Sequence, residues 1–204
     1  PGVQISTDSD TICVYDVANF YGSGSANIVT WYWTFGDGGT SVLQNPQHAF
    51  SSPGVYNITL TGTDDNGCDS TDTYQITVNP LPYADFSTSA PSCVNSPVDF
   101  FDMSSAPNGW VVEWHWYFGD GTDTVVLFPD PPDVTHTYSS SGSFIASLVV
   151  TSNAGCQDSI THEVDVSVSP QADFIAGGPR CDGNLIQFFD QSQGFGTDIQ
   201  AWSW

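Results

Sequence analysis

Apolar and polar residues alternate along six segments of the chain, with the period of two that is typical of half-buried β-strands. These segments are residues 29–35, 55–62, 74–78, 112–118, 144–150 and 164–168. The alternation places Val29, Trp31, Trp33 and Phe35 on one face, and Val112, Trp114, Trp116 and Phe118 on one face of the matching strand. Glycine, proline, asparagine and aspartate separate the segments, and few stretches have helical periodicity. We therefore expect an all-β protein.

The chain also repeats itself after about 85 residues. WYWTFGDG at 31–38 recurs as WHWYFGDG at 114–121, HAF at 48–50 as HTY at 136–138, and GC at 67–68 as GC at 155–156. ADF at 84–86 recurs as ADF at 172–174 and begins a third copy. We divide the chain into repeat 1 (1–80), repeat 2 (81–170) and an incomplete repeat 3 (171–204), each complete repeat being a two-sheet sandwich of short strands.

Trp-x-Phe-Gly-Asp-Gly, followed by His-x-Phe/Tyr and a Gly-x-Tyr/Phe strand, resembles the PKD domain family, named for the polycystic kidney disease protein. The resemblance covers 1–170 as two copies and 171–204 as the start of another. It implies tandem immunoglobulin-like β-sandwiches that act as spacers or as protein- or glycan-contact modules, and not as enzymes. Tandem copies with a cysteine after the late glycine resemble those of large surface and secreted proteins of Bacteroidetes-type bacteria, adhesins among them.

The net charge of the chain limits the kinds of partner that it can bind. The chain has 23 acidic residues, one basic residue (Arg180) and no lysine, which gives a net charge of −22. Nucleic acids and anionic lipid surfaces are bound through lysine and arginine, so we exclude both as partners. No apolar run reaches the roughly 18 residues of a membrane span, and we expect no membrane insertion of this segment. Lysine-based crosslinks and Schiff-base chemistry are also excluded.

The repeated motif comprises Trp33, Phe35, Gly36, Asp37, Gly38 and His48 in repeat 1, and Trp116, Phe118, Gly119, Asp120, Gly121 and His136 in repeat 2. One interpretation is an aromatic sugar platform beside a carboxylate; the other is a core strand that ends in a tight turn. We favour the second, because the aromatic residues share one face and the glycines permit positive φ angles. The two histidines lie in separate repeats, so we expect each to hydrogen-bond its own turn rather than to catalyse.

Five cysteines in so polar a chain indicate an oxidising, extracellular compartment. Cys13 and Cys68 take the same places in repeat 1 as Cys93 and Cys156 take in repeat 2. We therefore predict the disulfides Cys13–Cys68 and Cys93–Cys156, with free thiols as the alternative. Cys181 matches Cys93, and we expect its partner beyond the end of this chain.

Two loops contain further candidate sites, one for calcium and one for a contact with another surface. Asp64 and Asp65 cluster oxygens that suit calcium, although solvated acidic turns explain them as well and repeat 2 has no such pair; we expect no other cofactor. The segment 125–132 makes repeat 2 longer than repeat 1 and is apolar. It suits a contact with a partner or a neighbouring domain, and packing against its own sandwich is the equal alternative.

Together these features predict a non-catalytic, extracellular structural and adhesive segment of a long bacterial surface adhesin, a stalk or fibre. Its partners would be neighbouring repeats, surface glycans or proteins, and further copies in a filament. The alternative is a carbohydrate- or protein-binding accessory module of a secreted hydrolase, for which the expected exposed Trp110 is a contact candidate. We expect repeat 3 to continue in a longer polypeptide; completion by strands of another chain is the alternative.

Overall fold

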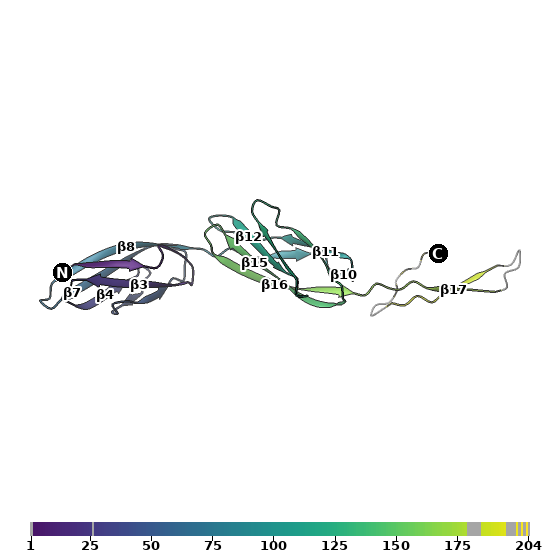
Figure 1. The fold of residues 1–204 in the computed structure, drawn as a ribbon, viewed down its shortest axis with the longest axis horizontal. Coiled ribbons are helices and arrows are strands. Elements are labelled where there is room, and N and C mark those ends of the chain that lie inside the picture. Colours follow the sequence, from purple (N-terminus) through teal and green to yellow (C-terminus); the bar gives the residue numbers. More distant parts are fainter. Residues whose placement is uncertain are drawn as a thin grey trace. The chain divides into compact units, whose positions relative to one another are not determined.

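The structure, a computed structural model, describes residues 2–25, 27–178, 185–194, 199, 201 and 203. Repeat 1 contains β1 (Val3–Thr7), β2 (Thr11–Cys13), β3 (Val17–Gly24), β4 (Ile28–Thr34), β5 (Thr40–Ser41), β6 (Gln47–Ala49), β7 (Gly54–Asp64) and β8 (Asp69–Asn79). One sheet has the order β2-β8-β7-β4-β5 and the other has the order β1-β3-β6 (Figure 1). Repeat 1 is therefore a two-sheet sandwich.

Repeat 2 contains β9 (Phe86–Thr88), β10 (Ser92–Cys93), β11 (Pro97–Asp102), β12 (Val111–Tyr117), β13 (Asp123–Leu127), β14 (Val134–Thr137), β15 (Gly142–Ser152) and β16 (Gln157–Ser167). Its sheets have the orders β10-β16-β15-β12-β13 and β14-β11-β9, which repeat the arrangement of the first sandwich strand for strand. The chain is thus a tandem of immunoglobulin-like β-sandwiches, as the sequence predicts.

The structure forms two compact units, whose border does not coincide with the border between the repeats. The first unit is Pro1–Ala84 with Ser104–Glu113 and Val150–Asp158. The second is Asp85–Met103, Trp114–Val149 and Ser159–Trp204. The β15–β16 turn of repeat 2 therefore belongs to the same compact unit as repeat 1.

Large aromatic and aliphatic side chains from both sheets fill each sandwich. In repeat 1 the fully buried side chains include Phe20, Trp33, Phe35, Phe50 and Leu60. In repeat 2 they include Phe100, Trp116, Tyr138 and Leu148. Burial of so much apolar surface is the main force that holds each sandwich together.

The predicted inward face of β4 is correct at Trp33 and Phe35 but wrong at Val29. The pairing of β4 with β7 shifts its register between Ile28 and Thr30, where an irregularity of the β-bulge type interrupts the ladder. Such a shift reverses the faces of the residues before it. Val29 is consequently 60% exposed, whereas Ile28 packs against the core.

In the C-terminal segment, β17 (Phe174–Gly177) pairs with β18 (Gln187–Asp190). Phe174 lies opposite Asp190, as Phe86 lies opposite Asp102 in the β9–β11 pair. The pairing of β17 with β18 therefore reproduces the pairing of β9 with β11 in repeat 2. None of the described residues lies in a helix that is long and apolar enough to cross a membrane.

Candidate functional site: the Gly-Asp-Gly turns and the disulfide

The Gly-Asp-Gly turn of repeat 1 follows β4 and is held by its own aspartate. Gly36 and Gly38 have φ angles of 81° and 96°, which favour glycine. Phe35 N–H donates to the Gly39 carbonyl at 3.0 Å, and Gly39 N–H donates to Asp37 Oδ1 at 2.8 Å. The aspartate thus satisfies a backbone donor of the turn, as the turn interpretation of the motif requires.

His48 joins this turn to the opposite sheet. Its Nε2 lies 2.7 Å from Asp37 Oδ2, and His48 belongs to β6. The imidazole stacks on Phe35 with ring centroids 4.0 Å apart and meets the ring of Phe50 edge-on at 4.7 Å. The expected hydrogen bond from the histidine to the turn is therefore present, and the side chains of His48 and Asp37 are 19% and 22% exposed.

Repeat 2 has the same arrangement. His136 Nε2 lies 2.8 Å from Asp120 Oδ2, and the ring stacks on Phe118 at 4.0 Å and meets Tyr138 edge-on at 4.7 Å. Thr122 donates from both its N–H and its hydroxyl to Asp120 Oδ1. Two copies of one geometry indicate a structural element of the domain.

The tryptophans of the motif are core residues. Trp33 and Trp116 are 0% and 1% exposed, and their indole N–H groups donate to the carbonyls of Leu43 at 2.8 Å and Pro132 at 3.1 Å. A buried indole cannot serve as a sugar platform, so that interpretation is wrong for both. Trp110, by contrast, is 56% exposed, as expected.

The Asp–His pairs are part of the packing of each sandwich. An Asp–His pair becomes a general base when its imidazole contacts a nucleophile. The imidazole Nε2 of His48 and of His136 instead hydrogen-bonds the aspartate of its own turn, and each ring is packed between aromatic side chains. The pairs connect the two sheets of each sandwich instead.

These contacts also set the ionisation of the two aspartates. Burial raises the pKa of the Asp37 carboxyl, but hydrogen bonds from His48 and from the Gly39 N–H outweigh it, so that the pKa lies below its usual value. Burial also raises the pKa of the Asp120 carboxyl, but hydrogen bonds from Thr122 and His136 outweigh this effect, and the pKa lies below its usual value. Hydrogen bonds to the ionised form thus dominate in both repeats.

We expect stability to depend on these carboxylates in acid. Their folded pKa is depressed, so their contribution is complete above the unfolded pKa of about 3.9 and is lost as the pH falls through the folded pKa. Urea midpoints of the wild type should therefore decline below about pH 4. The double variant Asp37→Asn/Asp120→Asn should decline less steeply; parallel curves would contradict the assignment.

Tyr138 carries a hydroxyl that its counterpart Phe50 lacks. The hydroxyl is buried and donates to the Phe118 carbonyl at 2.9 Å, and burial followed by the Asp120 charge raises the pKa of Tyr138 to about 12. We expect Tyr138→Phe to cost about 1–2 kcal/mol in urea unfolding, because the Phe118 carbonyl loses its donor. Tyr56→Phe, which removes an exposed hydrogen bond to Ser52, should change stability by less than about 0.5 kcal/mol. Equal losses would show that burial of the hydroxyl is immaterial.

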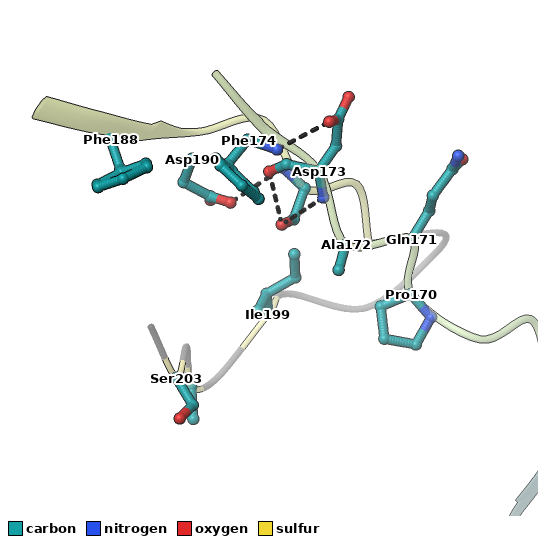
Figure 2. A pocket seen from close by; sticks show the side chains of 11 residues that line it. Pro170, Gln171, Ala172, Asp173, Phe174, Phe188, Asp190, Ile199 and Ser203 are labelled. Atoms are coloured by element: carbon teal, nitrogen blue, oxygen red, sulfur yellow. Dashed lines mark hydrogen bonds between the residues drawn. The ribbon is translucent and has the colours of Figure 1, made fainter. Parts of the chain in front are cut away.

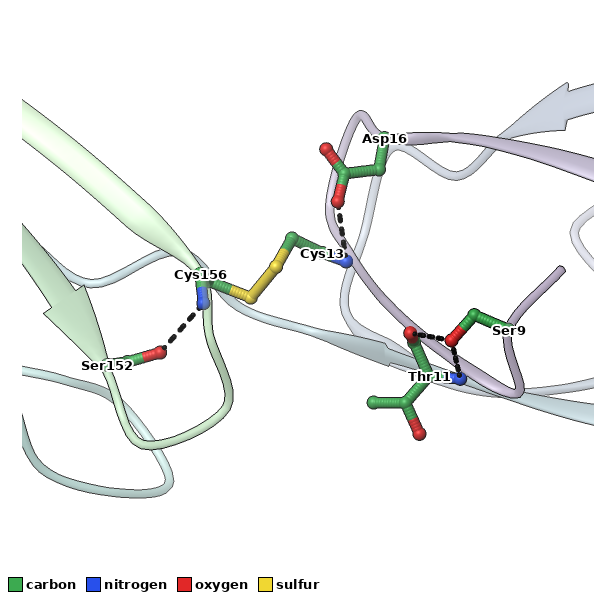
Figure 3. Close-up of a disulfide and its surroundings, with 6 residues drawn as sticks. All are labelled: Ser9, Thr11, Cys13, Asp16, Ser152 and Cys156. Atoms are coloured by element: carbon green, nitrogen blue, oxygen red, sulfur yellow. Dashed lines mark hydrogen bonds between the residues drawn. A yellow bond between two sulfur atoms is a disulfide. The ribbon is translucent and has the colours of Figure 1, made fainter.

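The disulfide is Cys13–Cys156, with Cα atoms 5.6 Å apart, and Cys68 and Cys93 are free (Figure 3). The predicted pairs Cys13–Cys68 and Cys93–Cys156 are therefore wrong. The bond joins repeat 1 to the β15–β16 turn of repeat 2. Cys181 lies outside the described residues.

Strand register explains why bonds within a repeat do not form. β2 runs parallel to β8 with Cys13 opposite Asn79, the last residue of β8, whereas Cys68 precedes the first residue of β8. At about 3.3 Å per residue, the two cysteines lie roughly 35 Å apart along the strand. Disulfides require Cα atoms within about 7 Å. Cys93, opposite Ser167 at the end of β16, is separated from Cys156 in the same way.

The bonded cysteines lie in ordered surroundings. Cys156 is 1% exposed, and its N–H donates to Ser152 Oγ at 3.2 Å. Cys13 N–H donates to Asp16 Oδ2 at 3.1 Å (Figure 3). Asn153 N–H donates to the Trp110 carbonyl at 2.9 Å, which connects the turn to the adjoining loop. The length of β8 was the feature that could have revealed this pairing. Cys68 directly precedes β8, whereas Cys13 lies beside its last residue, so the two cysteines of repeat 1 are at opposite ends of that strand.

The candidate calcium ligands belong to a β-turn. Asp64 Oδ1 accepts the N–H groups of Cys68 and Asn66 at 2.8 and 2.9 Å, and these bonds, the one from Cys68 first, hold the pKa of Asp64 below its usual value. Asp65 Oδ1 accepts from the Asn66 side chain. The described residues include no group of three or more histidine, cysteine or acidic side chains placed to hold a metal. The turn alone accounts for both aspartates.

The apolar segment 125–132 contacts its own sandwich at one end, where the Pro132 carbonyl accepts from the buried Trp116 indole, and is exposed at the other. Val125, Leu127 and Phe128 are exposed, and β13 is the last strand of its sheet. Exposed apolar side chains on an edge strand suit contact with another surface. The segment thus packs on its own sandwich at Pro132 and leaves Val125, Leu127 and Phe128 exposed for a surface contact, which stays a prediction.

A cavity of about 580 Å³ lies in the C-terminal segment and is lined by Phe174, Phe188 and Ile199, among others (Figure 2). Phe174 and Phe188 correspond to Phe86 and Phe100, which are buried in the core of repeat 2. The lining of the cavity therefore includes the counterparts of two core residues of repeat 2.

In both sandwiches of this chain, a Gly-Asp-Gly turn is hydrogen-bonded to a histidine of the opposite sheet, and this shared geometry defines one class of domain. The PKD domain model matches residues 1–78 and again residues 79–168, and the chain belongs to this family. The pre-pro-metalloprotease PrtV of Vibrio cholerae is 32% identical over 108 residues, which are 50% of this chain and 11% of the protease. Collagenase ColA of Bacillus cereus is 35% identical over 60 residues, 29% of this chain and 6% of the collagenase. The chain thus spans a small part of these relatives.

Among solved structures, the PKD1 domain of Vibrio anguillarum Epp is 25% identical, with a TM-score of 0.39 over 45% of this chain and 99% of that domain. The PKD1 domain of the Vibrio cholerae metalloprotease PrtV is 26% identical, with a TM-score of 0.37 over 42% and 96%.

Proposed function

We propose that the chain is a non-catalytic, extracellular segment of a long bacterial surface adhesin of the Bacteroidetes type, in which tandem PKD domains form a stiff stalk or fibre. The observation that carries this proposal is the Cys13–Cys156 bond. Repeats 1 and 2 are connected twice, once by the proline-containing linker 79–82 and once by the disulfide. Two covalent connections restrict the motion of one domain relative to the other.

Other features support a structural role. The groups of the repeated motif that resemble catalytic residues are engaged in holding sheets together. Disulfides persist in oxidising compartments, which fits a position outside the cell. A net charge of −22 favours repulsion between neighbouring stalks and opposes lateral bundling. Longitudinal contacts in a filament, and contacts with surface glycans or proteins through the exposed side chains of 125–128, are compatible with this charge.

A second candidate is an accessory module of a secreted hydrolase that binds carbohydrate or protein. The matches to a metalloprotease and a collagenase favour it. Trp110 is the exposed aromatic residue on which such a contact would depend. Collagen and glycans are the ligands to try.

Small-angle scattering and binding assays distinguish the two. For a stalk, we expect the wild type to have a fixed maximum dimension, the Cys156→Ser variant to show a broader distribution of dimensions, and Trp110→Ala to leave binding unchanged. For an accessory module, we expect collagen or a glycan to bind the wild type but not Trp110→Ala. Identical scattering of wild type and Cys156→Ser would contradict the stalk.

A further inference from the structure

Cys68 and Cys93 occupy the same two places as the cysteines of the disulfide. Cys13 is the last residue of β2 and Cys93 is the last residue of β10, and each lies beside the final residue of a parallel strand. Cys68 and Cys156 each follow a glycine in the turn that precedes a long strand. The disulfide thus uses the early cysteine of one repeat and the late cysteine of the next, which leaves one cysteine of each kind among the described residues.

The surroundings of the early cysteines agree in detail. The residue after each cysteine donates its N–H to the parallel strand: Val14 to Asn79 and Val94 to Ser167, both at 2.9 Å. The residue two places on has a positive φ, 70° at Tyr15 and 62° at Asn95. The backbone of β10 therefore presents Cys93 as β2 presents Cys13.

The late cysteines agree as well. The Cys68 carbonyl accepts from Asp64 N–H at 3.0 Å, and the Cys156 carbonyl accepts from Ser152 N–H at 2.8 Å. The preceding glycines have φ angles of 79° and 82°. A side-chain oxygen, Asp64 Oδ1 or Ser152 Oγ, accepts the N–H of the cysteine in each turn. Cys68 is exposed and Cys93 is partly exposed, whereas the bonded Cys156 is buried.

We propose that Cys93 and Cys68 form further inter-repeat disulfides of the Cys13–Cys156 type. Cys93 would bond the Gly-Cys turn of a PKD repeat that follows repeat 2, and Cys68 would bond the early cysteine of a PKD repeat that precedes repeat 1. Each bond forms when two thiols pass two electrons and two protons to a disulfide oxidant such as oxidised glutathione, which leaves as two thiols. These disulfides would add to the stiffness of the proposed stalk. The proposal takes from the proposed function only the presence of neighbouring repeats.

The test extends the full chain by a second copy of residues 81–170, placed after residue 170. The new junction joins Val168-Ser169-Pro170 to Leu81 and so resembles the natural sequence Val78-Asn79-Pro80-Leu81. The late cysteine of the copy then follows Cys93 by one repeat, as Cys156 follows Cys13. The replacements Val94→Ile and Gln157→Asn, made in the copy alone, give its cysteine peptides masses different from those of repeat 2. The chain is oxidised with glutathione, alkylated with iodoacetamide and digested with pepsin without reduction, because trypsin has only Arg180 to cleave after.

Mass spectrometry should show Cys93 linked to the late cysteine of the copy, together with the Cys13–Cys156 bond, and alkylation of Cys93 at least ten-fold below that in the unextended chain. In the matched control Cys93→Ser, the late cysteine of the copy should become alkylated. Unchanged alkylation of Cys93, or a bond from Cys93 to any other cysteine, would overturn the proposal.

A second extended chain places the same copy, followed by one leucine, before residue 1. Here Cys68 should link to the early cysteine of the copy, and an alkylated Cys68 would overturn that half of the proposal. If one extended chain lacks the Cys13–Cys156 bond because it has not folded, the other gives the answer. If the scattering experiment contradicted the stalk, the disulfide pairing found by mass spectrometry would still stand. The two proposals can therefore fail independently.

Discussion

Gly119→Ala is expected to destabilise the second sandwich by about 3–5 kcal/mol, enough to unfold much of the population of a marginal domain. Gly119 has a φ of 81°, and a Cβ there would lie 2.5 Å from the Ile145 carbonyl oxygen of β15. The obstacle is backbone in the middle of a sheet, so it cannot rotate away as a side chain would. Urea unfolding followed by circular dichroism measures the loss.

The matched control is the other glycine of the same turn. Gly121 has a φ of 94°, but a Cβ there would meet nothing within 4 Å, so Gly121→Ala should cost only about 1 kcal/mol. Gly36→Ala in repeat 1 should fall between the two, since its Cβ would lie 2.9 Å from the Asn57 carbonyl oxygen. Equal losses for Gly119 and Gly121 would show that close packing against β15 is unimportant.

Trp116→Ala should cost about 3–5 kcal/mol, the range found for removing a large buried aromatic side chain. The indole packs against Phe86 and Phe100 with ring centroids 5.3 and 5.8 Å apart and donates to the Pro132 carbonyl. The variant therefore leaves a cavity and an unpaired carbonyl together. Differential scanning calorimetry should show the transition of the second sandwich at a much lower temperature.

The control for Trp116 is Trp110, which is 56% exposed. Trp110→Ala should change stability by less than about 0.5 kcal/mol, as most exposed substitutions do. Comparable transitions in both variants would mean that the motif tryptophan contributes little to the core.

Local patterns carried the predictions that the structure confirms. Alternation identified the buried face that includes Trp33 and Trp116, since burial on one side of a strand leaves a period of two. Recurrence of the Gly-Asp-Gly turn with a later histidine identified their contact, because the same residues at similar spacings in both repeats indicate the same local structure. These inferences depend on neighbours along the strand or on a repeated motif.

Predictions that depended on distant pairing were wrong. β2 pairs in parallel with β8, which places Cys13 beside the last residue of β8 and far from Cys68. Because β2 has only three residues, the alternation of apolar and polar residues does not reveal which strand it pairs with. Val29 was assigned to the wrong face because the irregularity at 28–30 changes the register without a glycine or proline to mark it. Strand partners and register breaks are set by the whole sheet, so a local pattern does not reveal them.

The Cys13–Cys156 bond has a mechanical consequence. It closes a loop of 143 residues, whose extended contour length is roughly 480 Å at about 3.4 Å per residue. When the chain is pulled from its two ends, tension passes from Cys13 through the sulfur atoms to Cys156, and the residues between them carry none of it. Most of both sandwiches is thereby shielded from the load, and the chain can lengthen only where it lies outside the loop.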